Sequence, residues 1–385
     1  MKEKIVHVVL RDYHDDYSYQ ENLLSQKHAE LGYEVMVITT QRYSDKNKVK
    51  SFHKVRDYTN KYDIRVSILP CKARNNFTGI FMDQSIGLYE KLCEFAPDYI
   101  FVHNFAYRDI EHIVKYAQKN PDVKVFADCH TDYYNSSYST IYGKAKSLFA
   151  KREGHILNKV AIKFWGTTPW RVEFLRNVYK LPVEKTDLLI LGADEQQILK
   201  IDREGNRKYI RERYGIPENA FLVITGGKLD KRKQQNLLME AVGKMIEDNI
   251  WLLAFGTPSD EMKTVFQKYE KVKNIIMPGW VSPNDVYSLF MASNLAFFPG
   301  THSVLWEQSV ACSIPLVVKH WHGMEHVNVN GNALLLDDIT VDSISKVIKD
   351  LNYSNQYNQM LSAAKECAES FYLREIAMKA IGLKD

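Results

Sequence analysis

Short apolar runs alternate with amphipathic, helix-like segments along this chain, and the alternation begins twice. The strand-like runs of the first series are Ile5–Leu10, Glu34–Thr39, Ile64–Leu69, Tyr99–Val102, Val123–Ala127, Lys163–Thr167 and Leu188–Leu191. Helix-like segments lie between several of them, for example Tyr19–Leu31, Ile80–Glu94 and Asp109–Lys119. This order of elements predicts a parallel, doubly wound α/β sheet.

The second series follows a polar, helix-like stretch at residues 195–219. Its strand-like runs are Leu222–Thr225, Trp251–Phe255, Asn274–Met277, Leu295–Phe298, Leu316–Val318 and Ala333–Leu336. We therefore predict an α/β protein with two Rossmann-like domains facing across a cleft. The first domain is expected at residues 1–194 and the second at 195–365. A final helix at 366–385 is expected to pack back toward the first domain.

Composition excludes several classes of protein. The formal net charge of +4 is too small for a committed nucleic-acid binder. No apolar run approaches the roughly 18 residues that span a bilayer, and the first residues run directly into a strand, so we expect no signal peptide. The five cysteines are scattered without a C-x-x-C pair, which favours reduced thiols and a cytoplasmic location.

One predicted strand ends in two glycines and a group of cations. The run Phe221–Thr225 is followed by Gly226, Gly227 and Lys228, and Lys233 lies just before an apolar-striped helix. The carboxyl ends of such strands bind ligands, glycine allows close approach of the backbone, and a helix start with lysines favours an anion. The pattern predicts a diphosphate site that includes Gly227, Lys228 and Lys233. The competing interpretation is a solvated, charged helix start.

A second polar turn follows the run Leu295–Phe298 and leads into a helix with Glu307. Apolar neighbours surround this glutamate, so its carboxylate needs hydrogen-bond partners, which ribose hydroxyls would supply. The alternative is an exposed helix glutamate. Backbone N–H groups of the turn are expected to reach a sugar or phosphate; its residues are Gly300, Thr301, His302 and Ser303.

Histidines mark two further candidates. His130 lies just past the run Val123–Ala127, between Asp128 and Asp132, which can orient it or raise its pKa; a structural role is the alternative. The segment His320–His326 contains histidines and a glutamate. Gly323 and the preceding strand do not fit the helical zinc pattern, so we interpret this segment as a loop over a ligand and expect no metal site.

Residues 139–165 carry six lysines and arginines against one acid, with apolar residues at roughly helical spacing. A basic amphipathic helix of this kind can bind an anionic membrane surface. The alternative is a core-facing helix with a solvated basic face.

These motifs resemble the retaining nucleotide-sugar glycosyltransferases of family 4, over nearly the whole chain. In that family, Gly-Arg after the first strand of the second domain is followed, five positions after the arginine, by Lys-Gly. Here Gly227-Lys228 and Lys233-Gln234 keep the spacing. The resemblance implies the GT-B fold and a catalytic role for Lys228 and Lys233 on the donor's diphosphate. Lysine in place of arginine loses a planar fork but keeps the charge.

The resemblance also assigns roles around the donor sugar and the acceptor. Glu307 matches the family's ribose-binding glutamate, whereas Pro299 stands where a second glutamate is expected eight positions earlier. Thr301, His302 and Ser303 are candidates to replace it. His130 resembles the histidine near the reacting end of the sugar. The segment with Asp12, His14 and Tyr19 resembles a branch from bacterial surface-polysaccharide clusters and implies the acceptor side.

Taken together, the resemblance implies a retaining hexosyltransferase that needs no cofactor beyond its donor. It would move a sugar from a nucleotide-diphosphate sugar, with a UDP-sugar favoured, to a glycan or lipid-linked acceptor in surface-polysaccharide synthesis. Its expected place is the cytoplasm, peripheral on the inner face of the membrane. Three alternatives remain open: an epimerase or hydrolase of the same fold, an inverting transferase with His130 as base, and an inactive sugar-nucleotide-binding scaffold.

Overall fold

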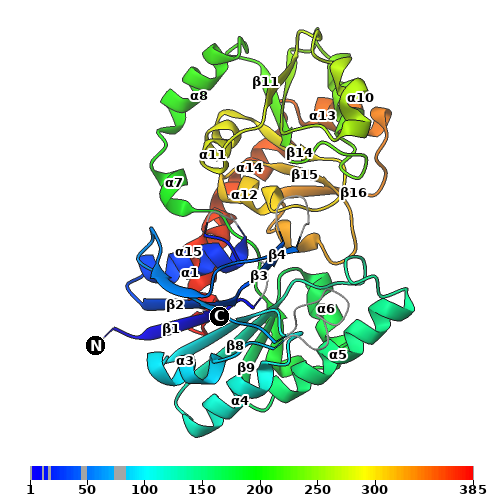
Figure 1. Cartoon of the computed structure of the whole chain (residues 1–385). Coiled ribbons are helices and arrows are strands. Elements are labelled where there is room, and N and C mark those ends of the chain that lie inside the picture. The colour runs from blue at the N-terminus through cyan, green and yellow to red at the C-terminus, as the bar shows by residue number, and fades with distance from the viewer. Residues whose placement is uncertain (1, 11–12, 16–18, 45–49, 73–83, 385) are drawn as a thin grey trace. The chain divides into compact units, whose positions relative to one another are not determined.

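The computed structural model describes residues 2–10, 13–15, 19–44, 50–72 and 84–384. The chain divides into two compact units (Figure 1). Unit 1 comprises Met1–Ile190 and Ile376–Asp385, and unit 2 comprises Leu191–Glu375. The polypeptide therefore passes between the units twice.

Unit 1 contains an eight-stranded sheet with the strand order β10-β9-β8-β7-β1-β2-β6-β5. Neighbouring strands pair in parallel, except that β5 is antiparallel to β6. The strands are β1 (Lys4–Val8), β2 (Glu34–Thr40), β5 (Arg56–Thr59), β6 (Arg65–Leu69), β7 (Tyr99–His103), β8 (Lys124–Cys129), β9 (Ala161–Gly166) and β10 (Thr186–Leu188). A separate antiparallel pair consists of β3 (Arg42–Ser44) and β4 (Lys50–Phe52).

Helices cover this sheet because their apolar residues recur every three or four positions. In α4, Ile110, Ile113, Val114 and Ala117 are buried, as expected for an amphipathic helix on a sheet. The helices α3, α4 and α5 pack in that order (Figure 1). The helices of unit 1 are α1 (Gln20–Glu30), α3 (Leu88–Phe95), α4 (Ile110–Lys119), α5 (Ile141–Leu157) and α6 (Pro169–Asn177), with a 3₁₀ turn η1 (Val183–Lys185).

Unit 2 contains a six-stranded, wholly parallel sheet with the order β13-β12-β11-β14-β15-β16. Every residue of β11, β12 and β14 is buried, which is typical of parallel strands covered on both faces. The strands are β11 (Phe221–Gly226), β12 (Ile250–Phe255), β13 (Ile275–Gly279), β14 (Leu295–Phe298), β15 (Leu316–Lys319) and β16 (Ala333–Leu336).

The helices of unit 2 follow its strands in the doubly wound manner. They are α7 (Glu195–Leu199), α8 (Arg203–Arg213), α9 (Gln235–Gly243), α10 (Lys263–Gln267), α11 (Pro283–Ala292), α12 (Leu305–Ala311), α13 (Val341–Leu351) and α14 (Asn355–Cys367), with 3₁₀ turns η2 (Asp260–Met262), η3 (Glu325–Val327) and η4 (Ala368–Phe371).

The last helix, α15 (Leu373–Ala380), carries the chain from unit 2 back into unit 1. Within unit 1, the indole N–H of Trp165 donates to the backbone oxygen of Ala380 at 3.0 Å. The Nε2 atom of His28 lies 2.9 Å from the backbone oxygen of Ala377. Residues at the end of the chain therefore complete the packing of unit 1.

The α/β fold class predicted from the sequence is confirmed, but β3, β4 and β5 were not predicted, and two of the expected elements of unit 1 have other bounds. The run Leu188–Leu191 was expected to be a strand, but β10 ends at Leu188. After β10, the backbone N–H of Leu189 donates to the backbone oxygen of Gly166, and the chain then leaves the sheet. The expected helix at Ile80–Glu94 begins at Leu88, and residues 80–83 lie outside the described residues.

Candidate functional site

In unit 2, the doubly wound order changes direction between β11 and β14. The chain proceeds from β11 outward to β12 and β13, and then returns to place β14 on the other side of β11. Open α/β sheets bind ligands at such a switch point, beyond the carboxyl ends of the strands. The turn Gly226–Lys233 follows β11 and the turn Gly300–Ser303 follows β14, so the fold brings the two predicted donor segments together.

Lys233 connects these two turns through hydrogen bonds. Its Nζ donates to the backbone oxygens of Thr301 at 2.6 Å and His302 at 2.8 Å. The backbone N–H of Thr301 donates in return to the oxygen of Arg232 at 3.1 Å. Gly300 lies so close to the backbone of Arg232 and Lys233 that a Cβ atom would overlap both. The glycine is therefore required by close packing.

The two lysines predicted to bind a diphosphate have different surroundings. Burial lowers the pKa of Lys233 to about 8. Lys228 is exposed and follows Gly227, whose φ of +99° is a left-handed conformation that favours glycine. The sharp turn thus directs Lys228 to solvent, whereas Lys233 lies against the backbone of the neighbouring turn.

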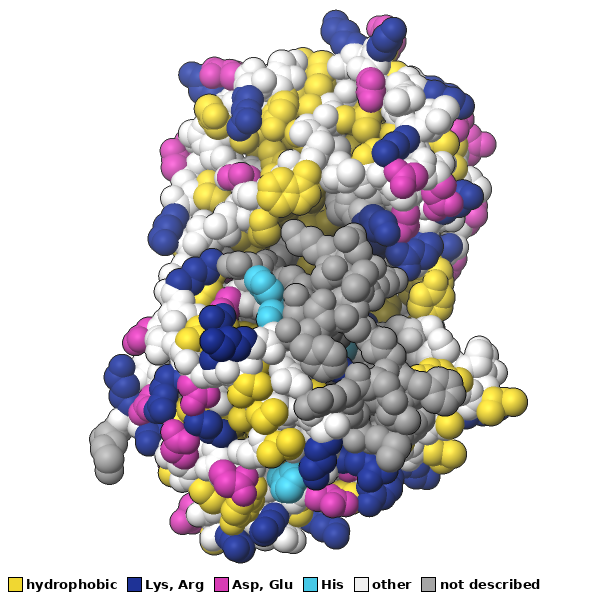
Figure 2. All heavy atoms as spheres, viewed as in Figure 1, with side chains coloured by type: hydrophobic (Ala, Val, Ile, Leu, Met, Phe, Trp, Pro, Cys, Tyr) yellow, Lys and Arg dark blue, Asp and Glu magenta, His cyan; other side chains and the backbone are white. Residues whose placement is uncertain are grey.

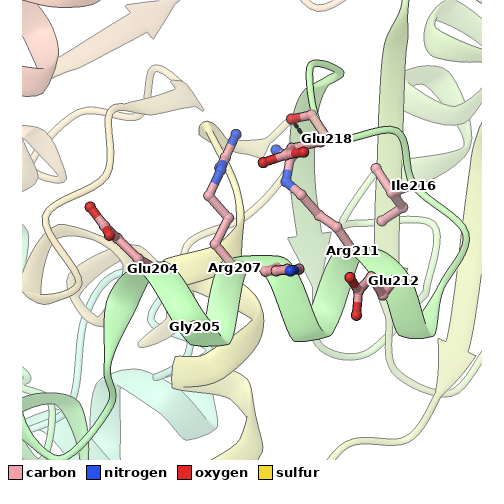
Figure 3. A pocket seen from close by; sticks show the side chains of 8 residues that line it. Glu204, Gly205, Arg207, Arg211, Glu212, Ile216 and Glu218 are labelled. Atoms are coloured by element: carbon pink, nitrogen blue, oxygen red, sulfur yellow. Dashed lines mark hydrogen bonds between the residues drawn. The ribbon is translucent and has the colours of Figure 1, made fainter.

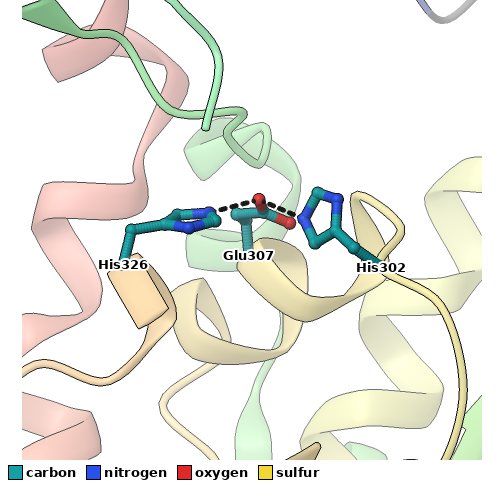
Figure 4. Close-up of side chains that lie close together, drawn as sticks. All are labelled: His302, Glu307 and His326. Carbon is teal, nitrogen blue, oxygen red and sulfur yellow. Dashed lines mark hydrogen bonds and ion pairs between the residues drawn. The ribbon is translucent and has the colours of Figure 1, made fainter. Parts of the chain in front are cut away.

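Glu307 lies fully buried on α12 between two histidines (Figure 4). Its Oε1 atom is 2.7 Å from Nε2 of His302 and 2.8 Å from Nε2 of His326. Burial alone would raise the pKa of this carboxyl, but the two histidines lower it to about 2. Among the described residues, its Oε2 atom has no hydrogen-bond partner.

These three side chains also form a set that zinc can bind. Their candidate ligand atoms lie within 4.8 Å of one another. Ligand atoms around tetrahedral zinc lie roughly 3.3 Å apart, given metal distances of about 2.0–2.1 Å. The shorter separations at Glu307 are those of hydrogen bonds, so the arrangement is a carboxylate held by two imidazoles.

In unit 1, the corresponding switch point lies between β1 and β7. His130 follows β8, the next strand, and its side chain is 28% exposed, which leaves it accessible. Its Nε2 atom lies 3.3 Å from Oδ2 of the buried Asp128. Burial opposes a charge on His130, but Asp128 raises its pKa. Asp132 pairs instead with Arg171 at 3.2 Å.

The predicted acceptor-side residues follow β1. The ring of His14 is 6.3 Å from that of His53, and its backbone oxygen accepts from Asn22. Tyr19 precedes α1 and is 57% exposed. Asp12 lies outside the described residues.

Sequence reasoning did not assign His326 or His103 to a site. His326 was grouped with His320, but His320 pairs with Asp337 and Glu325 while His326 pairs with Glu307. A signal was present: a buried glutamate needs donors, and His326 is a donor on a neighbouring loop. Whether His326 or His320 contacts Glu307 depends on the turn η3, and the periodicity of the sequence does not predict that turn.

Of the segment at 139–165, residues 141–157 form α5, whose first turn is capped by Thr140, whereas residues 161–165 belong to β9. Ile141 and Leu148 are 90% and 66% exposed, so apolar side chains accompany the basic ones at the surface. Arg152 forms ion pairs with Glu111 and Glu153. On the face in Figure 2, basic and acidic side chains are interspersed. None of the described helices is both long and apolar enough to span a bilayer.

A hollow of about 490 Å³ lies along α8, where Arg207 and Arg211 project from the helix (Figure 3). Arg211 donates to the backbone oxygens of Pro217, Glu218 and Ala220, just before β11 begins. The hollow is therefore near the amino end of β11, away from the switch point. We interpret Arg211 as a structural cation that holds the turn before this strand.

Comparison with known proteins finds a family model that matches part of the chain and solved structures with a similar fold. Residues 206–366, within unit 2, match the family described as glycosyl transferases group 1. No curated protein matches the chain in sequence. Three solved structures illustrate the similarity of fold, and in each case the alignment covers 98% of this chain.

The first is HepE from Anabaena in complex with UDP and glucose, with a TM-score of 0.65, 14% identity and 98% of that chain covered. The second is sucrose-phosphate synthase from Thermosynechococcus elongatus, with a TM-score of 0.64, 13% identity and 97% covered. The third is WaaG, a glycosyltransferase involved in lipopolysaccharide biosynthesis, with a TM-score of 0.59, 13% identity and 98% covered. The chain thus has the GT-B fold, and residues 206–366 of its unit 2 are similar to the glycosyl transferases group 1 family.

Proposed function

We propose that this protein is a retaining glycosyltransferase that moves a sugar from a nucleotide-diphosphate sugar to a glycan or lipid-linked acceptor. The observation that carries the proposal is the switch point of unit 2. There, Lys228 and Lys233 come from the turn beyond β11, and the buried carboxylate of Glu307 comes from α12, the helix that follows the turn beyond β14. Cations suit a diphosphate, and a carboxylate suits ribose hydroxyls.

In this proposal, the lysines stabilise the negative charge that develops on the leaving diphosphate. Two N–H groups of Lys233 are engaged by Thr301 and His302, and the third is available to a phosphate oxygen. Lys228 is exposed at the neighbouring turn and supplies a second positive charge.

Glu307 would bind the ribose through Oε2, because Oε1 is occupied by His302 and His326. Since Oε2 is buried, a hydroxyl can reach it only when residues around it shift, and the turn at 300–303 leads into the helix that carries Glu307. Donor binding should therefore change amide hydrogen exchange in this turn. Unchanged exchange at saturating donor would oppose the assignment of the ribose to Glu307.

The contact of His130 with Asp128 is compatible with both courses. An inverting enzyme needs a base to deprotonate the acceptor, and Asp128, which raises the pKa of His130, would suit it to that role; retention is proposed from the family resemblance, in which this histidine contacts the sugar. A protonated histidine is a donor and suits contact with a sugar hydroxyl. In the retaining course, the leaving phosphate takes the proton of the acceptor.

The proposed donor is a UDP-sugar and the proposed setting is bacterial surface-polysaccharide synthesis. Support comes from HepE, solved with UDP and glucose, and from WaaG, which acts in lipopolysaccharide biosynthesis. At 14% and 13% identity these neighbours suggest a donor and a setting to test.

Thermal shift with a panel of UDP-, ADP- and GDP-sugars tests the proposal, because a ligand specific for the native state raises the melting temperature. The best donor is then incubated with candidate glycan and lipid-linked acceptors. Product with the anomeric configuration of the donor supports a retaining transferase. Free sugar identifies a hydrolase, an altered donor an epimerase, an inverted product an inverting enzyme, and binding without turnover a scaffold.

We also propose that α5 docks on an anionic membrane surface. Its exposed Ile141 and Leu148 lie on the same helix as the exposed Lys144, a combination that suits a lipid interface. Sedimentation with phosphatidylserine vesicles tests this. Leu148→Asp should reduce binding, whereas Leu199→Asp, at a site on α7 that is 69% exposed, should not. Equal binding by both variants and the wild type would contradict the proposal.

A further inference from the structure

Beneath the carboxyl edge of the unit 1 sheet, four histidines and an aspartate form a continuous line of polar contacts. The line runs from His130 through Asp128, His103, His7 and His28 to the backbone oxygen of Ala377. The successive distances are 3.3, 2.9, 2.9, 3.0 and 2.9 Å. We call the three inner residues His28, His7 and His103 the histidine row.

The fold places this row in a dry environment. His7 is on β1, His103 ends β7 and Asp128 is on β8, and these three strands are neighbours in the sheet. His7 and Asp128 are completely buried and His103 is 2% exposed. The ring of Phe101 packs against His7 and His103.

The number of protons in the row follows from its two ends. The carbonyl of Ala377 accepts hydrogen bonds only, and so does the carboxylate of Asp128. Four contacts join these acceptors, and each contact requires one proton. Three neutral imidazoles carry three N–H groups. The row therefore holds one additional proton and a net charge of +1.

The hydrogen bonds alone allow the extra proton on any of the three rings, and the Asp128 carboxylate favours His103, the ring of the row that it contacts directly, because opposite charges attract most strongly at the shortest distance. His28 donates from Nε2 to Ala377, so in its neutral form it accepts at Nδ1 from Nε2 of His7. His7 then accepts at Nδ1 from Nε2 of His103. His103 must also donate from Nδ1 to Asp128, so both of its nitrogens are protonated. Consistent with neutral inner rings, burial lowers the pKa of His28 to about 4 and that of His7 well below its usual range.

Asp128 links the row to the candidate site. Its Oδ2 atom faces both His103 and His130, and its Oδ1 atom accepts from the backbone N–H of Asn104 at 2.9 Å. Burial would raise the pKa of this carboxyl, but His103 and His130 lower it far below its usual range. A buried carboxylate with these donors keeps a fixed orientation.

We propose that His103 is a buried imidazolium whose ion pair with Asp128 positions His130, which makes His103 a positioning residue for the transferase site. The proton count does not depend on the function of the protein, while the effect on sugar transfer rests on the proposed function. The other groups around the line are Tyr33, whose ring meets His28 edge-on, and Glu21 and Arg171, which act on His130 from its exposed side with opposite sign.

Nitrogen-15 NMR of the full chain labelled at histidine tests the proton count directly. We expect two buried imidazoles as neutral Nε2–H tautomers and a third, His103, with both nitrogens protonated at pH 7.5. Single His→Gln variants assign the signals. A neutral His103 at pH 7.5, or Nδ1–H tautomers at His7 and His28, would overturn the inference.

Two glutamine variants separate positioning from packing. Glutamine has a donating nitrogen and an accepting oxygen, so His28→Gln can replace a neutral imidazole, whereas His103→Gln cannot donate toward His7 and Asp128 from opposite ends of the side chain. His103→Gln should raise the titration midpoint of His130, because Asp128 then has one counter-charge less, and should lower kcat on the order of 10-fold or more. The KM for the donor should stay unchanged, because the donor residues are on unit 2. His28→Gln should leave the titration midpoint of His130 in place and should change kcat and KM by no more than about twofold.

The outcomes of the two experiments are distinct. Equal shifts of the His130 midpoint in both variants would reduce the row to a packing element and refute the proposal. If His103→Gln fails to fold, the tautomers of the wild-type protein still decide the proton count. If no nucleotide sugar is turned over, the proposed function fails while the NMR result stands by itself.

Discussion

The side chain of Lys233 has two roles. It holds the turn after β14 through two backbone oxygens, and it is the buried cation at the proposed diphosphate site. Lys233→Ala would therefore disturb the turn as well as remove a charge. Lys228 is exposed, so its replacement tests the charge with less effect on the fold.

The lowered pKa of Lys233 predicts a pH dependence of donor affinity. Burial lowers this pKa to about 8, so the charge is present below that pH and is lost as the pH rises through it. Above pH 8, binding of a diphosphate must take up a proton, and affinity should fall by up to about tenfold per pH unit. Titration calorimetry with UDP from pH 6.5 to 9.5 measures this.

Two variants serve as controls for this pH dependence. Lys233→Arg should abolish the step near pH 8, because a guanidinium stays charged throughout the range. Lys228→Ala should weaken binding across the range and leave the step in place. A step that persists in Lys233→Arg would assign it to another group.

Glu307 predicts a stability effect in acid. Its folded-state pKa of about 2 is depressed by His302 and His326 against the opposing effect of burial. The stabilisation, about 3 kcal/mol, is present above pH about 4.5 and is lost as the pH falls toward 2. Glu307→Gln should melt at a lower temperature than the wild type at pH 7, and the difference should shrink between pH 4.5 and 3. Calorimetry checks this, and a constant difference would contradict the pKa assignment.

At the scale of elements, the turn after β14 depends on close packing. Gly300→Ala places a Cβ against the backbone of Arg232 and Lys233, and overpacking of this kind costs about 1–3 kcal/mol. The turn should shift and UDP affinity should fall.

Gly243→Ala is the matched control for this substitution. Gly243 ends α9, and a Cβ there meets Ile275 and Val272 at an ordinary 3.6 Å. Alanine should stabilise the helix by up to about 1 kcal/mol. Chemical denaturation should therefore give opposite signs for the two variants. A stabilising Gly300→Ala would show that the turn has room to adjust.

Some helices, strands and turns could be predicted from the sequence and others could not. The buried parallel strands could be predicted because their residues are almost all apolar, as at every position of β12 and β14. The strand β5, Arg-Asp-Tyr-Thr, could not, because it lies at the sheet edge and its residues are mostly exposed. The turns after β11 and β14 were predicted from their glycines, whereas the contact between Lys233 and the opposite turn depends on strand order, which a local pattern does not contain.

The residues of the candidate site also divide into those that the sequence indicates and contacts that only the structure shows. The sequence indicated Glu307, Lys233 and His130 one at a time, from polar residues after apolar runs. It did not indicate that His326 and His302 share one carboxylate oxygen, or that His7, His28 and His103 form a row. Such contacts join segments that are far apart in the chain, and only the tertiary structure brings them together.

At the scale of the whole molecule, the chain ends inside the unit in which it began. Ile376, Ala377, Ala380 and Ile381 are buried, and Ala377 and Ala380 accept from His28 and Trp165. Deletion of residues 376–385 should therefore destabilise unit 1 and leave unit 2 intact.

Hydrogen-exchange mass spectrometry checks this prediction. Amides of α1 and β9 should exchange faster in the truncated protein, while β11 and β14 should exchange at the wild-type rate. Equal acceleration in both units would show that the deletion unfolds the protein globally.

The return of the chain to unit 1 has a consequence for synthesis on the ribosome. Domains generally fold in order as they emerge, the N-terminal one first. Here residues 1–190 emerge first but lack their closing segment until residues 376–385 leave the exit tunnel. At about 5–20 residues per second, that wait lasts roughly ten to forty seconds. Unit 2 emerges during this interval, so unit 1 is expected to wait incomplete while unit 2 is made, and both units become complete at nearly the same time.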